Sequence, residues 1–569
     1  MVKFFFIYPP SADPTTPPLA LARIKGAVSS HLGSKGRFEF IDENQKFTRY
    51  VVDLGLSGKI REWIRNALET SLPNELRIEL ERASAWSEHL AEDLLKAMGT
   101  LKTEHLFLDI SRYRFAYETI EKAFHAFSLA YYPAMVGYAT ARLALDIRSS
   151  AQAREALSSA RLNPYLHYFE ARVPDYEKAD VLGISVVYSS QLLPSLTLAK
   201  LVKQRNKGAL VIMGGPCASS LRSELEDGFG EFVDLVIPGD AEAFFQYLCD
   251  RGIELDEKAK SLDAAQTYAQ GPPQQWFKEP DSRLDYSWAA IESYLLPEPI
   301  ICLDITRGCY YGKCVFCAYG HREGYYRRMR PDQVVSVIKD IEEKIGCSKF
   351  FFSVDVVDPG FLEEVSAGLI SAGLKIAYCL DARLEKRFAQ RDFVEMLFRS
   401  GCRAISFGME SASQGTLDAM GKGTDSSYFP VILKNLFDAG IHVQVHLIHG
   451  FPEEPASALK KTIHFLHSFK EEITNAGASR FALLKGSIIE KNPKKYGISK
   501  MVKVGDLSLD YEYYCDMDTE YPSFETFKKT LFNMFPAVGR LTGSTTDYLI
   551  YAARYKPSEL KKRIRRILP

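Results

Sequence analysis

From residue 300 onward, short apolar runs recur at regular intervals, and this recurrence narrows the possible folds more than anything else in the chain. Helix-like stretches rich in charged residues separate the runs, as happens when parallel strands alternate with helices. The runs lie at residues 301–305, 350–354, 376–380, 404–407, 443–448 and 480–484. Six such strands predict a partial (β/α)6 barrel over residues 300–500, and ligand-binding residues are expected at the carboxyl ends of its strands.

The N-terminal part shows a similar alternation with one long interruption. Its apolar runs predict buried parallel strands, because strands covered on both faces are apolar throughout. The predicted strands lie at residues 1–8, 38–42, 180–187, 210–213 and 233–237. Between the second and third of them, residues from about 58 to 160 repeat Leu, Ala and charged residues at helical spacing, which predicts a helical insertion. Residues 1–252 therefore predict an α/β domain with a doubly wound parallel sheet.

Two stretches lack this alternation. Residues 253–299 carry many Pro, Asp, Gln and Ser residues and are interpreted as a linker. Residues 501–569 are interpreted as a mixed C-terminal segment, and their basic run at 561–566 as a solvated helix face. Neither stretch carries a motif that indicates a substrate.

Charge and cysteine content narrow the classes of partner. Lys and Arg (71) almost balance Asp and Glu (72), so no overall field attracts nucleic acid or an anionic membrane. A small molecule or a peptide is the expected substrate, with no nucleic-acid or membrane partner. Ten cysteines in 569 residues are too few for a disulfide scaffold, and no apolar run approaches the ~20 residues of a spanning helix. A cytoplasmic protein is expected.

Three cysteines lie close together directly after the first predicted barrel strand. They are Cys309, Cys314 and Cys317, in the sequence Thr-Arg-Gly-Cys-Tyr-Tyr-Gly-Lys-Cys-Val-Phe-Cys. Three thiolates can bind three irons of a [4Fe–4S] cluster and leave the fourth iron open to a ligand. The alternatives are a chance grouping of buried cysteines and a zinc site, which normally needs a fourth ligand such as His321.

This cysteine loop resembles the signature of the radical S-adenosylmethionine (SAM) superfamily, including the aromatic Phe316 before the last cysteine. Four residues, where three are usual, separate the first two cysteines. The resemblance implies that SAM chelates the open iron and that polar groups at successive strand ends hold the rest of it. The residues at the matching positions are Phe316, Asp355, Arg383, Glu410, Ser411 and Gly450. Arg383 is expected to pair with the carboxylate of SAM, whereas His442, His446 and His449 are expected at core or rim positions.

The N-terminal fragments resemble the cobalamin-binding domain that precedes the barrel in one large class of these enzymes. The resemblance places cobalamin near Pro10, Ser185, Tyr188, Gln191, Gly214, Gly215 and Glu242. The Asp-x-His-x-x-Gly motif that supplies a histidine to cobalt is absent from the sequence, as it is from many members of the class. A cobalamin-like domain that has lost its cofactor is the alternative.

The resemblance as a whole implies methyl transfer to a poorly activated carbon, with electrons from an external donor such as a flavodoxin or a ferredoxin. The fragments around residues 163–194 most resemble the subgroup that modifies ribosomally made peptides or their amino-acid precursors, so a peptide, an amino acid or a natural product is the expected substrate. Two alternatives stay open. In the first, the same cofactors serve a rearrangement, a ring contraction or the transfer of another SAM fragment. In the second, the chain is a non-catalytic iron–sulfur or zinc protein.

Overall fold

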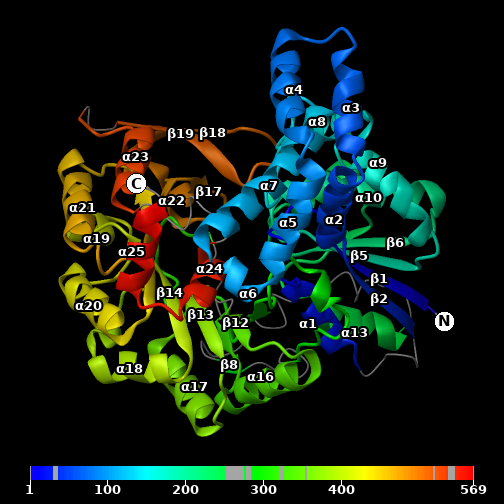
Figure 1. Cartoon of the computed structure of the whole chain (residues 1–569). Helices are drawn as coiled ribbons and strands as arrows, with labels where there is room; N and C mark the ends of the chain where they lie inside the picture. Colours follow the sequence, from blue (N-terminus) through cyan, green and yellow to red (C-terminus); the bar gives the residue numbers. More distant parts are fainter. Residues whose placement is uncertain are drawn as a thin grey trace. The chain divides into compact units, whose positions relative to one another are not determined.

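The computed structural model describes residues 2–29, 36–251, 275–276, 283–318, 326–352, 355–516, 520–535 and 545–567 (Figure 1). The chain divides into two compact units, which we describe separately. Unit 1 comprises Met1–Tyr268, Lys278–Pro299 and Gly505–Leu509. Unit 2 comprises Ala269–Phe277, Ile300–Val504 and Asp510–Pro569.

Unit 1 is built on a parallel five-stranded sheet with the strand order β2-β1-β5-β6-β7. The strands are β1 (Val2–Tyr8), β2 (Gly36–Asp42), β5 (Val181–Ser185), β6 (Leu210–Gly214) and β7 (Leu235–Val236). The order reverses between β1 and β5, because β2 lies on one side of β1 and the later strands lie on the other. In sheets of this kind ligands bind at such a switch point, outside the carboxyl ends of the strands. The predicted doubly wound α/β sheet is confirmed.

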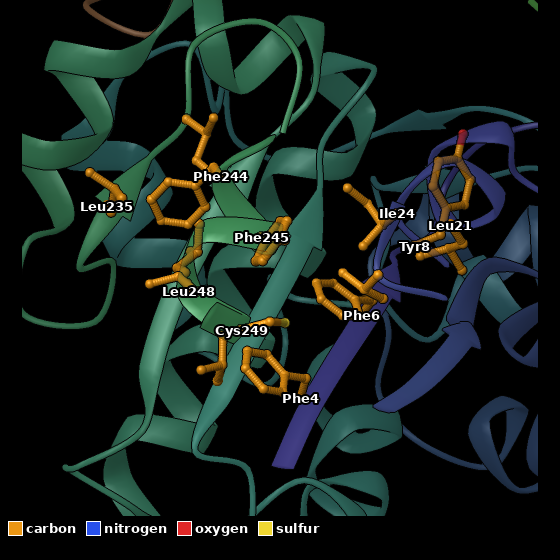
Figure 2. Close-up of a cluster of buried hydrophobic side chains, with 14 of the residues drawn as sticks. Phe4, Phe6, Tyr8, Leu21, Ile24, Leu235, Phe244, Phe245, Leu248 and Cys249 are labelled. Carbon is orange, nitrogen blue, oxygen red and sulfur yellow. The ribbon is translucent and has the colours of Figure 1, made fainter. Parts of the chain in front are cut away.

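The first strand is apolar throughout because it is covered on both faces. Phe4 and Phe6 point to one face, which α1 (Leu19–Ala27) and α13 (Glu242–Arg251) cover (Figure 2). The Phe6 ring meets the Phe245 ring edge-on, with the centroids 4.7 Å apart. Phe5 points to the opposite face and meets Tyr176. Alternation along one strand therefore supplies two cores at once.

Helices fill most of the interval between β2 and β5. They are α2 (Glu43–Leu56), α3 (Lys59–Leu68), α4 (Asn74–Ser87), α5 (Leu90–Lys102), α6 (Glu104–Phe107), α7 (Ile110–Leu129), α8 (Ser150–Leu157) and α9 (Leu166–Arg172). A hairpin of β3 (Met135–Val136) and β4 (Ala141–Arg142) interrupts them. Three more helices, α10 (Leu192–Arg205), α11 (Pro216–Ser220) and α12 (Arg222–Phe229), connect the later strands.

Part of the stretch that we interpreted as a linker is packed against unit 1. The backbone N–H of Asp285 donates to the carbonyl of Ala22 at 3.1 Å, and the Tyr294 hydroxyl donates to Asp42 at 2.8 Å. Tyr294 is 2 % exposed. The Pro- and Asp-rich composition of this stretch did not reveal these contacts. Residues 252–274 and 277–282 lie outside the described part of the chain.

Unit 2 contains a six-stranded sheet in which all neighbouring strands are parallel and follow one another in chain order. The strands are β9 (Ile301–Leu303), β12 (Lys349–Phe352), β13 (Ala377–Ala382), β14 (Cys402–Glu410), β15 (His442–His449) and β16 (Asn475–Arg480). The helices between them are α16 (Pro331–Ile345), α17 (Pro359–Ser371), α18 (Arg391–Arg399), α19 (Gln414–Ala419), α20 (Phe429–Ala439) and α21 (Ala456–Ser468). This is the predicted partial barrel.

The sixth strand was predicted at the wrong position in the sequence. We expected it at 480–484, but β16 ends at Arg480, and Leu483–Leu484 form β17 of another sheet. That sheet is antiparallel and includes β18 (Ile498–Lys503) and β19 (Asp510–Cys515). Phe481 and Leu483 are apolar because they fill the core beneath this second sheet. The true strand is poor in apolar residues, so its signal in the sequence was weaker than that of its neighbour.

The rest of unit 2 consists of short elements and C-terminal helices. They are β8 (Gln275–Trp276), β10 (Thr306–Arg307), β11 (Arg327–Arg328), α22 (Ile488–Lys491), α23 (Phe524–Met534), α24 (Thr545–Ala552) and α25 (Pro557–Ile567). The basic run lies on α25, where Lys561 departs from the predicted solvated face. Lys561 is 7 % exposed and donates to the carbonyl of Glu471 at 2.7 Å. In the described part of the chain, no helix has both the length and the apolar character needed to cross a bilayer.

Candidate active site

The three predicted cysteines lie on the loop that follows β10. Each thiol is partly exposed, and the three are close enough for charge on Cys309 or Cys317 to affect Cys314. Burial raises the pKa of Cys314, and the nearby cations of Lys422 and Arg383 oppose this effect. The loop is pinned at its start, because the backbone N–H of Gly308 donates to Asp355 at 3.0 Å. A second N–H, from Gly312, points to the Cys309 sulfur at 3.4 Å.

The arrangement of the thiols bears on the kind of metal that they suit. In the described ranges, no three His, Cys, Asp or Glu side chains converge on a position that would hold a single metal ion. His321, the predicted fourth ligand of a zinc site, lies outside the described residues. In an iron–sulfur cubane each cysteine binds a different iron, so such a site does not require the three thiols to share one ion position.

A second loop, residues 420–424, clasps the cysteine loop. The backbone N–H of Val315 donates to the Met420 carbonyl at 3.0 Å, and the Tyr311 hydroxyl donates to the Gly421 carbonyl at 2.8 Å. Gly423 has a φ of 65°, and a Cβ there would collide with the Tyr311 ring. Glycine is therefore required at this close approach. The clasp fixes the backbone that carries Cys314 and Cys317.

Lys422, at the centre of this clasp, is a residue that our sequence reasoning missed. Its side chain is buried, and its Nζ lies 2.8 Å from the Glu410 carboxylate and 5.9 Å from the centroid of the Phe316 ring. A buried cation near Cys314 provides a place for an anionic group of a ligand. The signal that could have found it is a lysine between two glycines just after α19.

Arg383 differs from our expectation of a guanidinium available to a ligand. Its Nε donates to Glu385 at 2.8 Å, and another of its nitrogens donates to the Lys422 carbonyl at 2.5 Å. The group lies 3.6 Å from the centroid of the Tyr311 ring and 3.9 Å from the Cys314 sulfur. Arg383 is therefore a brace between the two loops. All four contacts are to protein groups that a ligand would have to replace.

The predicted residues at the ends of β14 and β15 divide into two groups. Glu410 has a φ of 62° and directs its carboxylate to Lys422. Above Gly450, whose φ is 78°, an added Cβ would meet no atom within 4 Å. Both residues are thus at the open carboxyl edge. Ser411 is not, because its hydroxyl is 1 % exposed and bonds to Thr462 at 3.0 Å, so its role in the structure is to hold α21.

Tyr521, from the C-terminal segment, holds the turn after β15. Its hydroxyl accepts from the Gly450 N–H at 3.0 Å and donates to the Glu454 carboxylate. His449 packs against the same segment, with its Nε2 2.9 Å from the Pro522 carbonyl. His442 is fully buried. These two histidines occupy the predicted core and rim positions, whereas His446 is exposed on β15.

In unit 1, the residues predicted to contact cobalamin gather at the carboxyl edge of the sheet, but two of them serve the backbone. Gln191 is fully buried, since its amide accepts from the N–H groups of Val187 and Tyr188 and donates to the Pro9 carbonyl. It ties the end of β1 to the end of β5. Pro10 is buried beside this tie. The two residues therefore shape the switch point and do not present polar atoms to it.

The two predicted glycines differ in what they allow. A Cβ on Gly214 would meet nothing within 4 Å, so the space beside this strand end is open. A Cβ on Gly215 would lie 2.6 Å from the Val186 carbonyl oxygen, and the φ of Gly215 is 93°. Gly215 is therefore required by the backbone itself, and its place beside cobalamin stays a prediction. The remaining predicted residues are Ser185, which is partly exposed, Tyr188, which is 55 % exposed, and Glu242, which is buried at the start of α13.

Comparison with known proteins identifies the family of the barrel. Residues 303–466 match the model of the Radical SAM superfamily. The chain contains a radical SAM domain. The resemblance that the cysteine loop indicated is thereby confirmed.

Two relatives are named methyltransferases. The chain is 26% identical over 305 residues to an uncharacterized methyltransferase of Pyrococcus horikoshii, a match that covers 50% of this chain and 63% of that protein. It is 25% identical over 304 residues to the bacteriochlorophyllide d C-12(1)-methyltransferase of Chlorobaculum tepidum, covering 52% of this chain and 64% of that one. The matched parts thus span less than two thirds of either relative.

A solved structure resembles the fold of the whole chain. The radical S-adenosylmethionine methyltransferase TsrM from Kitasatospora setae, solved with cobalamin and a [4Fe-4S] cluster bound, superposes with a TM-score of 0.55 over 100% of both chains. The identity is 11%, so the likeness is one of fold. It supports the predicted order of an N-terminal doubly wound sheet followed by a partial barrel.

The geometry of the radical SAM domain fits the group that such domains carry. The Gly312 N–H points to one sulfur, and two buried cations lie beside another. These groups stabilise the thiolate form that binds iron, although burial still raises the pKa of Cys314 overall. The open edge above Gly450 and the Glu410–Lys422 pair lie at strand ends of the same sheet, where ligands of such barrels bind.

Proposed function

We propose that this chain is a cobalamin-dependent radical SAM methyltransferase that acts on a poorly activated carbon. The observation that carries the proposal is the loop of three neighbouring thiols, clasped by Lys422 and Arg383 at the carboxyl edge of a parallel barrel. The same chain contains a doubly wound sheet with open space beside the end of β6, which is the second ligand-binding fold that such an enzyme needs.

In this proposal, Cys309, Cys314 and Cys317 bind three irons of a [4Fe–4S] cluster. The cluster supplies the electron that cleaves SAM, and an external flavodoxin or ferredoxin delivers that electron. Lys422 is placed to pair with the carboxylate of SAM, because it is a buried cation within reach of the cysteine loop. Glu410 is placed to accept from the amine or a ribose hydroxyl of SAM. Phe316 and Gly450 border the same edge, and Asp355 holds the cysteine loop.

Unit 1 would bind cobalamin across the ends of β5, β6 and β7. Gly214 leaves open space there, and Ser185, Tyr188 and Glu242 stand at the same edge. Gln191 stabilises this edge by donating a hydrogen bond to the Pro9 carbonyl, and Pro10 is buried beside that bond. When bound, cobalamin supplies a carrier for the methyl group. The protein contributes placement and the exclusion of water.

The substrate class is a small molecule or peptide, including amino acids and related natural products. One relative, the anaerobic magnesium-protoporphyrin IX monomethyl ester cyclase of Cereibacter sphaeroides, is named for a ring closure. Ring closure or rearrangement with the same cofactors is therefore the second candidate function, and the mass of the product distinguishes it from methyl transfer.

The test uses the full chain, produced anaerobically with ample cobalamin and then analysed for cobalt, iron and labelled products. Incubation with SAM carrying a trideuteromethyl group should give a product that retains this group. Cobalt should be present at about one atom per chain. A chain that contains no cobalt and turns over equally well without cobalamin would refute the cobalamin-dependent reading and leave a radical SAM enzyme of another kind.

A further inference from the structure

Three polar side chains on neighbouring barrel strands form one hydrogen-bonded row in unit 2. Asp381 on β13 and Ser406 on β14 are register partners, and their side chains are hydrogen-bonded. The Ser406 Oγ lies 2.7 Å from the Nε2 of His446 on β15. None of the three side chains takes part in the clasp of the cysteine loop or in the turns at the strand ends.

The row lies beside the Glu410–Lys422 pair. His446 is the register partner of Gly408, and a side chain at Gly408 would come within 2.7 Å of the Glu410 carboxylate and 2.9 Å of the Lys422 ammonium. His446 is exposed, although both of its neighbours in β15 are buried. On its other side Gly477, also a register partner, presents no side chain, and even an added Cβ would stay 3.7 Å from the His446 Nδ1. The ring therefore faces open space.

The donors and acceptors in the row define the state of this ring. An ionised Asp381 can only accept, so Ser406 donates its O–H to Asp381 and accepts from the Nε2–H of His446. The neutral ring then keeps an unprotonated Nδ1, which has no partner in the described part of the chain. The side-chain amide of Gln444 lies 3.2 Å from the same Nε2, and with its oxygen turned toward the ring it accepts from the Nε2–H as well. The unused acceptor is therefore Nδ1, and it indicates a ligand that donates.

The charges around the ring support this assignment. The two ionic groups that face His446, Glu410 and Lys422, form a pair, and their effects on the ring largely cancel. Burial and the neighbouring Asp355 raise the pKa of Asp381 to about 6, which leaves it mostly ionised at pH 7. The row is not a hydrolytic triad, because in a triad the histidine lies between the serine and the acid. Here the serine lies between the histidine and the acid, and its O–H donates a hydrogen bond to Asp381.

We propose that His446 positions the substrate inside the barrel by accepting a hydrogen bond from a hydroxyl or an amine of that substrate. The inference rests on the proposed function, because it assumes that a substrate enters the barrel beside the SAM site. It narrows the substrate class to molecules with an O–H or N–H donor near the reacting carbon. A purely hydrocarbon substrate would leave the polar row unsatisfied, which is the kind of mismatch that a buried polar site discriminates against strongly.

The experiment compares variants in an anaerobic host that carries the chain with its genomic neighbours and is fed methionine with a trideuteromethyl group. Small molecules that gain the label with the wild-type chain, but not with Cys317→Ala, are products of the radical reaction. His446→Leu removes the acceptor, and His446→Asn keeps an acceptor oxygen near the position of Nδ1. Iron content and SAM affinity of the purified variants establish that the cofactor site is intact.

The proposal expects His446→Leu to lower the labelled product ~10–150-fold, as one lost hydrogen bond of ~1.5–3 kcal/mol implies, with His446→Asn within ~10-fold of wild type. Wild-type levels of product with His446→Leu would overturn the proposal. An equal loss of product with both variants would also overturn it, because the effect would then come from packing. A loss of SAM affinity would overturn it as well, because His446 would then belong to the SAM site. If the wild-type chain gives no labelled product, the proposed function itself fails, and this inference falls with it.

Discussion

Replacing Arg383 with lysine should loosen the cysteine loop even though the positive charge is kept. The guanidinium bridges Glu385 and the Lys422 carbonyl while it stacks on Tyr311 at 3.6 Å. A lysine ammonium is a point charge and can keep only one of these contacts at full strength. Because Arg383 is 5 % exposed, the lost contacts are little screened by solvent.

The magnitude follows from the contacts that lysine cannot replace. A desolvated cation–π contact contributes about 2 kcal/mol, and a hydrogen bond to a charged group ~1.5–3 kcal/mol. Since Glu385 is partly exposed, its contribution belongs at the low end of that range. If lysine recovers one contact, the net loss is ~2–3 kcal/mol, which corresponds to a cluster held about 30–150-fold less tightly.

The assay is anaerobic competition for iron between the reconstituted protein and a chelator. Arg387→Lys is the matched control, because Arg387 also pairs with a glutamate, at 2.6 Å, and lies 5.1 Å from a phenylalanine ring, but it makes no contact with the cysteine loop. The control should hold iron as the wild type does. If Arg383→Lys also holds iron as the wild type does and loses only SAM affinity, Arg383 is a SAM ligand and its assignment as a brace is refuted.

Three further changes test other parts of the account. Gly214→Leu should leave a folded protein with its iron–sulfur cluster but without corrin absorbance, whereas Gly215→Leu should fail to fold because its Cβ would meet the Val186 carbonyl; corrin bound by Gly214→Leu at the wild-type level would contradict this. Tyr521→Phe should weaken SAM binding several-fold with no loss of iron, because the turn at Gly450 loses its hydrogen bond to the Tyr521 hydroxyl. An unchanged SAM affinity in calorimetric titration would show that the turn does not need this bond. Asp381→Asn should flatten the dependence of the unfolding free energy on pH between pH 4 and 6. The raised pKa of Asp381, about 6, stabilises the folded state fully below the unfolded value of 3.8, and this stabilisation is lost as the pH rises to about 6. Urea titrations in which the variant and the wild type keep the same pH dependence across this range would contradict the prediction.

The strands were predictable from sequence where burial on both faces makes them apolar. β1 with Phe4, Phe5 and Phe6 is such a strand, and so is β5. The sixth barrel strand was not, because β16 reads Asn-Ala-Gly-Ala-Ser-Arg and its small residues carry no periodic signal. The stronger apolar run beside it belongs to the core of a different sheet.

The cysteine loop was predictable because ligand spacing is local in sequence. The roles of the residues around this loop were only partly predictable, because they depend on contacts between segments that are distant in sequence. Arg383 was expected to bind a ligand, but its partners Tyr311 and Lys422 lie 72 and 39 residues away and convert it into a brace. Gln191 was likewise expected at a ligand, and its amide is taken up by the backbone of residues 9, 187 and 188.

The central claim is that Cys309, Cys314 and Cys317 hold a [4Fe–4S] cluster that cleaves SAM. The most direct measurement is the formation of 5′-deoxyadenosine by anaerobically reconstituted, chemically reduced protein, together with its iron and zinc content. We expect about four irons per chain and 5′-deoxyadenosine from the wild-type protein and from Cys515→Ala, but none from Cys317→Ala. Stoichiometric zinc in place of iron, or equal 5′-deoxyadenosine from Cys317→Ala, would contradict the account.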